Sequence, residues 1–462
     1  MSHVPSGRAG QNVSPTIPAF PCAEFPSDTR HAKLLGIYPQ RQAGLYMQRV
    51  RIPGGVLSGD QWRVLARIAR QFTPATPLHL TTRQDIELHD LSATDVPGAQ
   101  QLLAKAGLTS MGSGGDTLRN TVVCPCAAGG ANAVPDMLPL AAAIDQAVAQ
   151  CEGLFALPRK FKISLGCEQG CGRPFMHDLA FIATQRDGRW GLKVIGAGSL
   201  GAKPALGIVL LDWIEVGQAV PMSVAAVRLF AREGDRQNRA KARLRHVRQR
   251  LGDEAFLTAL EQEFQAAKSQ REWPAVELTP RGGAALARRV LTFANGDITA
   301  DAADALAALA DLPGFSVRIG NDHRVYVFAD SDGAADQALA RTPALGDAMH
   351  SQVNVMACPG TRWCTRGLVD TNALADRIRK AVANYSGNLT IAISGCPNGC
   401  VTSAVADIGL TGGRSSADGT PVEKFTLMSG GGNGASDVLA QQVATGLSAD
   451  KAVAEVVRLA TV

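Results

Sequence analysis

The chain has 462 residues, of which 46% are hydrophobic, 19% are charged and 5% are aromatic. This length and composition predict a globular protein of about three domains. The formal net charge is only +5 and the basic residues are spread along the chain, so we expect no nucleic-acid partner. No uncharged apolar run reaches about 18 residues and residues 1–21 contain no apolar signal segment, so we expect no membrane span and a cytoplasmic location.

The first regular elements follow a β-α-β-α pattern. Four segments show in turn the periodicity of a strand, a helix, a strand and a helix: 45–53, 60–72, 78–88 and 96–106. This order is typical of half of a ferredoxin-like sandwich. We therefore expect an N-terminal arm over 1–44, of low regularity up to about residue 30, and a first half-domain over 45–115.

The second half of the chain repeats landmarks of the first in the same order. Each landmark returns about 230 positions later, which is typical of an internal duplication. The matching landmarks are Cys124-Pro and Cys358-Pro, the C-x3-C pairs that begin at Cys167 and Cys396, and the Gly-rich stretches 196–201 and 430–434.

The duplication predicts an α+β fold with two paired ferredoxin-like half-domains and two α/β cofactor-binding domains. The expected bounds are 45–115 and 284–350 for the half-domains, and 116–270 and 351–462 for the α/β domains. The stretch 196–201 also matches a dinucleotide-binding fingerprint, Gly-x-Gly-x-x-Gly. Pro204 and Gly207 follow where that fingerprint would open a helix, so we interpret the stretch as a Gly-rich loop.

Four cysteines in the second copy form two tight clusters. Cys358 and Cys364 have the spacing C-x5-C, and Cys396 and Cys400 have the spacing C-x3-C. Four thiolates are the ligands of a [4Fe–4S] cluster, and the adjoining Pro and Gly residues suit loops that turn backbone N–H groups toward sulfur. Structural zinc, which prefers tighter spacings, and unliganded thiols are the alternatives.

The first copy keeps cysteines at the corresponding positions, namely Cys124, Cys126, Cys167 and Cys171. They could hold a second metal centre, and the alternative is that they are relict or packing thiols. Because the first pair is spaced C-x-C, a cubane would be harder to build there than in the second copy.

Cationic residues lie at several turns and motif edges, including Arg49, Arg51, Arg83, Arg119, Lys160 and Lys162. If Lys160 and Lys162 lie in a strand, they point to one face and repel each other unless an anion lies between them. The spacing of Arg236, Arg239 and Arg243 predicts one stripe of a helix. Any one of these cationic residues alone would be explained as a solvated charge on the surface. Taken together, they predict a site for a polyanion and a small oxyanion.

These motifs resemble the sirohaem-containing sulfite and nitrite reductases over nearly the whole chain. The resemblance is carried by 45–55, 80–84, 119–124, 157–162, 357–360 and 394–400, of which the last reads Ser-Gly-Cys-Pro-Asn-Gly-Cys. The resemblance implies that the [4Fe–4S] ligands are Cys358, Cys364, Cys396 and Cys400. It also implies that the sulfur of Cys400 bridges the cluster to the iron of sirohaem.

The resemblance further assigns residues to the substrate and to the macrocycle. The positions that match substrate-binding residues are Arg49, Arg119, Lys160 and Lys162. The positions that match residues close to sirohaem are Arg83, His89 and Asn120. His79 and Glu87 stand where the family commonly has Arg and Gln, and this departure bears on how the sirohaem carboxylates are held.

The reaction that the resemblance implies is the six-electron reduction of sulfite to sulfide, with nitrite to ammonia as the other possibility. Sulfite reductases resemble this chain in the Arg-Lys-Phe-Lys segment, whereas nitrite reductases tend to replace its last lysine, so Lys162 favours sulfite. Because the sequence contains no recognisable flavin or nicotinamide domain, we expect a ferredoxin or a flavoprotein as the electron donor.

Two alternative functions follow from the same residues. Precorrin-3B synthase, an oxygen-dependent tetrapyrrole hydroxylase, resembles this scaffold and would bind its substrate in the sirohaem site. The form of the Cys396 segment and the pair Lys160 and Lys162 count against it. A non-catalytic iron–sulfur electron-transfer subunit would leave the two lysines unexplained.

Overall fold

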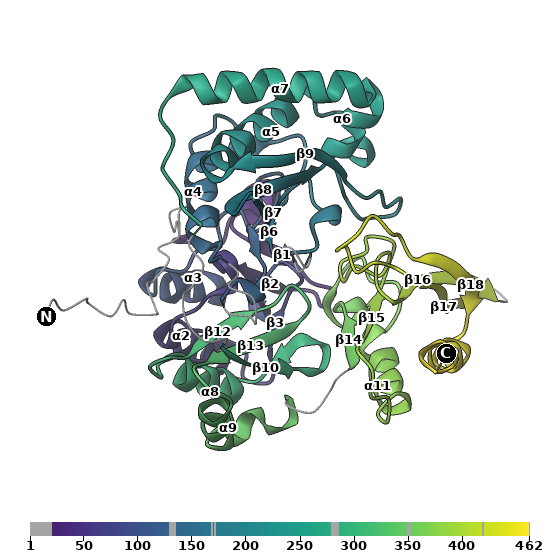
Figure 1. Ribbon diagram of the computed structural model, residues 1–462. Coiled ribbons are helices and arrows are strands. Elements are labelled where there is room, and N and C mark those ends of the chain that lie inside the picture. The colour runs from purple at the N-terminus through teal and green to yellow at the C-terminus, as the bar shows by residue number, and fades with distance from the viewer. Residues whose placement is uncertain are drawn as a thin grey trace, which may run out of the picture.

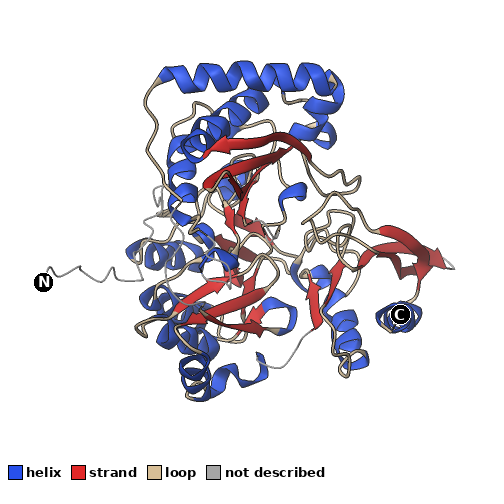
Figure 2. Ribbon diagram, in the orientation of Figure 1, coloured by secondary structure: helices blue, strands red, loops and turns tan. Residues whose placement is uncertain are grey.

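The computed structural model describes residues 21–128, 135–167, 170, 172–278, 286–348, 353–417 and 420–461. The strands of these residues form four sheets. Figure 1 shows one α/β domain at the top of the view, the paired half-domains below it, and the second α/β domain at the right. Figure 2 shows that helices flank the strands in each of these parts.

The first half-domain consists of β2 (Leu45–Val50), α2 (Gly59–Phe72), β3 (Leu78–Leu80), β4 (Ile86–Ser92) and α3 (Asp95–Lys105). The predicted order is confirmed, except that the segment 78–88 is two strands joined by a turn at 81–85. Ser58 and Gln61 form a capping box that begins α2. The apolar face of α2 then packs into the core with the residues Trp62, Leu65, Ile68 and Ala69.

The second half-domain repeats this arrangement with β10 (Ala287–Thr292), α8 (Ala300–Ala310), β12 (Ser316–Ile319), β13 (Arg324–Ala329) and α9 (Asp332–Ala340). Its strand order β10-β13-β12 corresponds to β2-β4-β3. The halves are joined because β11 (Asp297–Ile298) pairs with β3, and because α8 packs against α2. One hydrophobic core therefore serves both half-domains.

The N-terminal segment before β2 also contains regular structure. After α1 (Thr29–Leu34), the short strand β1 (Ile37–Pro39) pairs with β2 and forms one edge of the first sheet. Residues 1–20 lie outside the described residues, and the boundary at residue 44 stays a prediction.

The two α/β domains have sheets of identical topology. The first contains β5 (Val122–Val123), β6 (Ile163–Gly166), β7 (Leu179–Arg186), β8 (Arg189–Gly196) and β9 (Ile208–Glu215). The second contains β14 (Val353–Ala357), β15 (Leu389–Ser394), β16 (Ile408–Ala417), β17 (Thr420–Ser429) and β18 (Gln441–Leu447). In each sheet the first three strands are parallel and the last two are antiparallel, which confirms the duplication.

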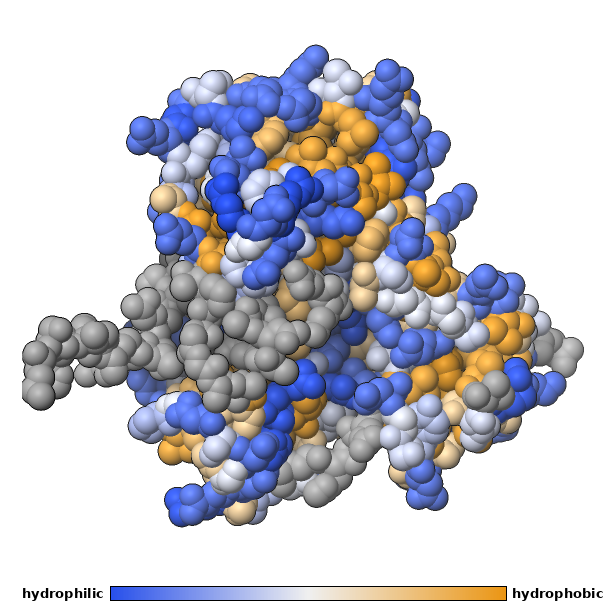
Figure 3. Space-filling model, viewed as in Figure 1, coloured by the Kyte–Doolittle hydropathy of each residue, from blue (hydrophilic) through white to orange (hydrophobic). Residues whose placement is uncertain are grey.

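Helices cover these sheets on their outer sides. Those of the first domain are α4 (Leu138–Ala149), α5 (Ala219–Glu233), α6 (Leu244–Leu251) and α7 (Asp253–Gln270), and those of the second are α10 (Gly360–Trp363), α11 (Thr371–Ala381) and α12 (Ala449–Ala460). Helix α7 packs on α5 through Phe256, Leu260 and Phe264. Hydrophilic residues cover its outer face at the top of Figure 3.

The structure confirms one loop prediction and overturns one helix prediction. Gly196 ends β8 and the chain continues through a loop to β9 without a helix, as expected for a Gly-rich loop. By contrast, Arg236, Arg239 and Arg243 do not form a helical stripe. Asn238 caps a short 3-10 turn, and Arg243 is extended because its side chain turns inward to Asp178, so α6 begins only after it.

No helix among the described residues combines the length and the apolar character that crossing a membrane requires.

Candidate active site

The four cysteines of the second copy follow two neighbouring strands. Cys358 comes directly after β14, and Cys396 and Cys400 lie in the loop after β15. Because β14 and β15 are parallel and Ala357 pairs with Ile393, both loops leave the same edge of the sheet. Cys364 joins them from the end of the one-turn helix α10.

Backbone N–H groups of these loops point at sulfur. Gly395 N donates to Cys358 Sγ at 3.1 Å, and Arg366 N donates to Cys364 Sγ at 3.4 Å. The loops also touch closely, since a Cβ on Gly395 would lie 3.0 Å from the Cα of Gly360. Such N–H donors and small residues are what an iron–sulfur cluster requires around its ligands.

The four thiols of these loops act on one another electrostatically. Burial and the nearby thiols of Cys400 and Cys364 raise the pKa of Cys358 to about 12, and the pKa of Cys396 and of Cys400 is raised as well, mainly by burial. Four neighbouring thiols in loops with N–H donors suit an iron–sulfur cluster.

Two lysines face the last of these cysteines. Lys160 and Lys162 lie in the segment that leads into β6, just before the strand itself. Burial and the charges of Arg243 and Arg119 lower the pKa of Lys160 to about 7. Burial has the largest effect on Lys162 and the positive charge of Lys160 has the next largest. Together they lower the pKa of Lys162 well below its ordinary value. Both ammonium groups act on the thiol of Cys400, so the structure brings these three residues together.

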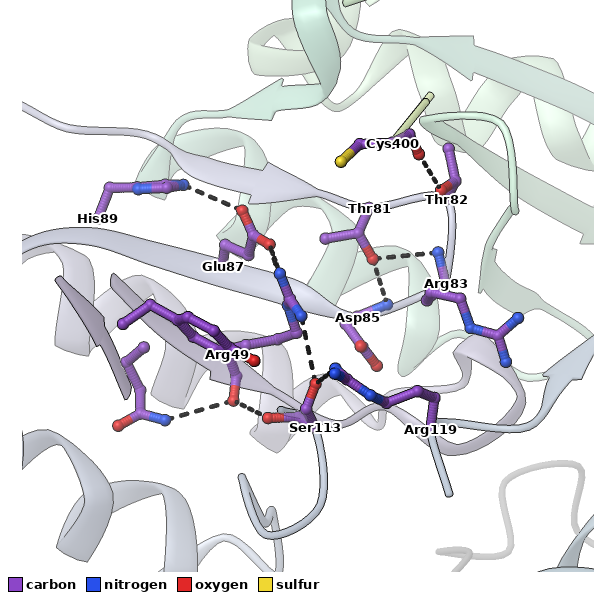
Figure 4. A network of polar contacts seen from close by, with 12 residues as sticks. Arg49, Thr81, Thr82, Arg83, Asp85, Glu87, His89, Ser113, Arg119 and Cys400 are labelled. Carbon is purple, nitrogen blue, oxygen red and sulfur yellow. Dashed lines mark hydrogen bonds and ion pairs between the residues drawn. The ribbon is translucent and has the colours of Figure 1, made fainter. Parts of the chain in front are cut away.

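Arg49 lies on β2 and is held by a carboxylate. Its Nε and Nη2 donate to Glu87 Oε1 at 3.0 and 2.6 Å (Figure 4). The other oxygen of Glu87 lies 3.2 Å from His89 Nε2. Burial alone would raise the pKa of Glu87, but Arg49 and His89 outweigh it and lower that pKa strongly, so this carboxylate stays ionised.

Arg119 is fixed beside Arg49 by a shared acceptor. The Nη1 groups of both arginines donate to the backbone oxygen of Ser113, and Arg119 Nη2 donates to Gly115 O at 2.8 Å. Tyr38 packs beside Arg49, whose guanidinium carbon lies over the Tyr38 ring at 5.5 Å from the ring centroid. Two guanidinium groups held so close together favour an anion between or beside them.

Arg83 and Asn120 are locked to each other but keep free polar atoms. Asn120 Nδ2 donates to Arg83 O at 3.0 Å, and Arg83 Nη2 donates to Asn120 O and Ile163 O. Among the described residues, Arg83 Nε and Nη1, Arg119 Nε and Asn120 Oδ1 are buried without a hydrogen-bond partner. The two Arg83 nitrogens are donors that fit the carboxylates of sirohaem, which would supply the missing acceptors.

The two departures from the family pattern also pair with charged groups. His79 Nδ1 lies 2.8 Å from Asp297 Oδ1, on the strand β11 of the second half-domain. Burial lowers the pKa of His79, but Asp297 and Glu87 outweigh it, so the net shift is upward. Next to it, His89 stacks on Trp363 with ring centroids 3.9 Å apart. The substitutions thus form a polar cluster between the half-domains and the cysteine loops.

The structure adds residues that the motifs did not reveal. Asp178 and Arg243 form a buried ion pair beneath Lys162, and Asp178 Oδ2 accepts from the backbone N of Lys162 at 2.8 Å. His177 is buried, and its Nε2 has no partner among the described residues. The one signal in the sequence was a polar pair, His177-Asp178, directly before the buried strand β7.

The thiols of the first copy are only partly described. Cys124 and Cys167 lie with their sulfurs 3.9 Å apart, and Cys126 lies 3.7 Å from Arg288 Nη1. Cys171 falls outside the described residues, so a second metal centre in this copy stays a prediction.

Comparisons with known proteins agree with this geometry. The model of the nitrite and sulphite reductase 4Fe-4S domain matches residues 114–268 and 348–461, and that of the nitrite/sulfite reductase ferredoxin-like half domain matches residues 38–106. Together they cover more than half of the chain. The chain therefore belongs to the nitrite and sulfite reductase family, whose members are oxidoreductases.

Individual relatives include both nitrite and sulfite reductases. The chain is 28% identical to the chloroplastic ferredoxin–nitrite reductase of Arabidopsis thaliana, over 86% of this chain and 73% of that protein. It is 30% identical to the assimilatory ferredoxin-dependent nitrite reductase of Haloferax mediterranei, over 87% and 77%. It is 27% identical to sulfite reductase [ferredoxin] 1 of Mycolicibacterium paratuberculosis, over 87% and 79%.

The fold is also that of a solved structure. The NirA protein of Mycobacterium tuberculosis superposes with a TM-score of 0.79 at 23% identity, over 92% of this chain and 85% of that one. Membership of the family gives this protein a [4Fe–4S] cluster and sirohaem as cofactors, and the donor set described above fits both. These comparisons do not favour the precorrin-3B synthase alternative.

Proposed function

We propose that this protein reduces sulfite to sulfide, in a six-electron reaction at sirohaem. The observation that carries the proposal is the pair Lys160 and Lys162, which lie half-buried together beside Cys400. Two lysines at one site favour the more highly charged of the two candidate anions, because a dianion relieves their mutual repulsion more fully than a monoanion. Nitrite is the competing substrate, and most of the relatives named above act on it.

The proposed roles follow from the contacts. When bound, the cluster and sirohaem supply the electrons and the iron at which the anion reacts. Cys358, Cys364, Cys396 and Cys400 would hold the cluster, and the thiolate of Cys400 would also serve the sirohaem site. Arg83, His89 and Asn120 would hold the macrocycle, and Arg83 would do so with nitrogens that have no hydrogen-bond partner among the described residues.

The substrate anion is bound by the cations that face Cys400. Arg49 and Arg119 orient it from one side, and Lys160 and Lys162 contact it from the other. The oxygen atoms of sulfite leave as water, and each departure needs protons. A lysine with a pKa of about 7 can donate one near neutral pH, so Lys160 is the proposed general acid.

We further propose ferredoxin as the electron donor, because the similar nitrite and sulfite reductases are named for it. Two exposed or half-exposed cations, Arg362 and Arg366, lie next to Cys364 at the cluster loop and suit an acidic partner. Ligand cysteines that must stay reduced also suit the cytoplasm.

The test is product analysis on anaerobically purified holoenzyme. With reduced ferredoxin as donor, we expect sulfide from sulfite at a higher kcat/KM than ammonia from nitrite. The reverse ratio would assign the protein to nitrite. A preparation that lacks sirohaem absorption and consumes oxygen would instead indicate the tetrapyrrole hydroxylase.

A further inference from the structure

Asp85 is a buried carboxyl group at the edge of the substrate cage that no role above explains. It ends the turn between β3 and β4 and is only 2% exposed. The turn is rigid, because Thr81 Oγ1 accepts from the N–H groups of Arg83 and Asp85, and Thr81 N donates to Asp85 O at 3.0 Å. The backbone that carries the Asp85 side chain is therefore held in place.

Four arginines surround this carboxyl group from different elements, namely Arg49, Arg51, Arg83 and Arg119. Two of them already have carboxylate partners, since Arg49 pairs with Glu87 and Arg51 pairs with the buried Asp145. Figure 4 shows Asp85 between Arg83 and Arg119.

The polar atoms around Asp85 are incompletely bonded. Asp85 Oδ1 is buried without a hydrogen-bond partner among the described residues, and the same holds for Arg83 Nε, Arg83 Nη1 and Arg119 Nε. A carboxylate that belonged to a structural ion pair would use these donors. Instead, Asp85 Oδ1 bonds neither the Arg83 donors nor Nε of Arg119, the arginine that is proposed to bind the anion.

Burial raises the pKa of Asp85 to about 6, even though the four arginines lower it. The group is thus close to its titration point near neutral pH. An oxyanion that enters the cage brings negative charge next to it, and like charges at short distance favour the protonated carboxyl.

We propose that Asp85 takes up a proton from solvent when an oxyanion binds in the cage, and holds this proton beside the anion for the reduction. The proton bonds to a carboxylate oxygen, so binding of a monoanion leaves the net charge of the cage unchanged. This inference rests on the proposed function, since it concerns the same anion site. Glu87 differs from Asp85 in that it takes up no proton, because Arg49 and His89 keep its carboxylate ionised.

The test measures proton uptake rather than turnover. Nitrite is the probe, because it remains a monoanion across the range used, and it is titrated into oxidised holoenzyme by calorimetry in buffers of different ionisation enthalpy. For the wild type we expect close to one proton taken up per anion above about pH 6, and a Kd that rises up to about tenfold per pH unit. For Asp85→Asn we expect the uptake to fall by close to one proton per anion, and the slope of Kd against pH to fall with it.

Two further variants keep the test decisive. Asp85→Glu retains a titrating carboxyl and should retain the uptake. Asp322→Asn is the matched control, because Asp322 is also buried with an unpartnered Oδ1 in the corresponding turn of the second half-domain, but hydrogen-bonds Tyr326. Deprotonation of Lys160 weakens anion binding in the wild type and in every variant. The test therefore compares the proton uptake and the pH slope of Kd of each variant with those of the wild type.

Unchanged proton uptake in Asp85→Asn, in a variant that keeps the sirohaem and cluster absorption of the wild type, would overturn the inference. Failure of the proposed function looks different, because the wild type would then reduce nitrite in preference to sulfite, or neither anion, whatever its proton uptake.

Discussion

Arg243 and Asp178 form a buried, two-pronged ion pair directly beneath the substrate lysines. Arg243 Nε and Nη2 donate to the two carboxylate oxygens of Asp178 at 3.1 and 2.6 Å. Asp178 is completely buried, and its Oδ2 also accepts from the backbone N of Lys162. The pair thus links the start of β7 and the approach to α6 to the segment that carries Lys160 and Lys162.

Removing one partner of this pair should destabilise the protein. In Arg243→Gln the carboxylate of Asp178 remains buried without its cation, and breaking a buried pair in this way costs about 3–5 kcal/mol. Chemical denaturation should show this loss in the free energy of unfolding. The exposed pair Arg189 and Glu215 provides the control, since Arg189→Gln should change stability by about 1 kcal/mol or less.

Replacing Lys162 by Asn should damage turnover but not cofactor binding. Loss of one preorganised cation next to a reacting oxyanion costs about 3 kcal/mol, which is about a hundredfold in kcat/KM for sulfite. The sirohaem absorption band should remain, because Lys162 is assigned to the substrate. Lys193→Gln on β8 is the control, and equal activity of both variants would contradict the assignment.

The dependence of kcat/KM on pH should reveal the deprotonation of Lys160. Its pKa is lowered to about 7, so the ammonium form is present below pH 7 and is lost as the pH rises through that value. With nitrite as substrate, kcat/KM should fall above about pH 7. In Lys160→Arg the cation persists, so the part of the weakening that begins near pH 7 should be lost and only the part expected from Asp85 should remain, although proton donation by Lys160 is lost. A profile unaffected by this substitution would exclude Lys160 as the titrating group.

Glu87→Gln should shift the preference between the two anions. Glu87 neutralises the charge of Arg49, so its replacement adds one positive charge to the cage. We expect the ratio of kcat/KM for sulfite to that for nitrite to rise by up to about tenfold, the effect of about 1.4 kcal/mol. Steady-state kinetics on both substrates checks this, and a fall in the ratio would mean that Glu87 acts through the macrocycle instead.

Loss of a single ligand should remove the cluster. Cys396→Ala leaves three thiolates and should lower the iron content and abolish the cluster signal in electron paramagnetic resonance of the reduced protein. Cys22→Ala, which alters a half-buried thiol far from these loops in sequence, should retain both. Retention of the full signal in Cys396→Ala would contradict the ligand assignment.

Much of the fold was predictable because its signals are local or repeated. The strand and helix of residues 45–72 follow from periodicity, and the duplication follows from landmarks that keep their order. The prediction that Arg236, Arg239 and Arg243 form one stripe of a helix was wrong. Asp178, a carboxylate distant from Arg243 in the sequence, determines where Arg243 points.

The candidate site was predictable only where it lies in motifs. The cysteines and lysines stand in short, specific segments, whereas Asp85 and His177 gain their character from burial and from neighbours brought in by other strands. Likewise, Trp363 lies between two cluster cysteines, but its stack on His89 depends on how the half-domain meets the loop. No periodicity or spacing encodes such contacts.

The pairing of β11 with β3 has a consequence for how the molecule can be assembled. This two-residue strand comes from the second repeat yet completes the sheet of the first, and its Asp297 bonds both His79 and Arg362. A fragment that ends before β11 would expose the edge of β3 and lose the counter-ion of a histidine near the reaction centre. Separately produced repeats should therefore recover their chemistry only when both fragments are mixed and associate.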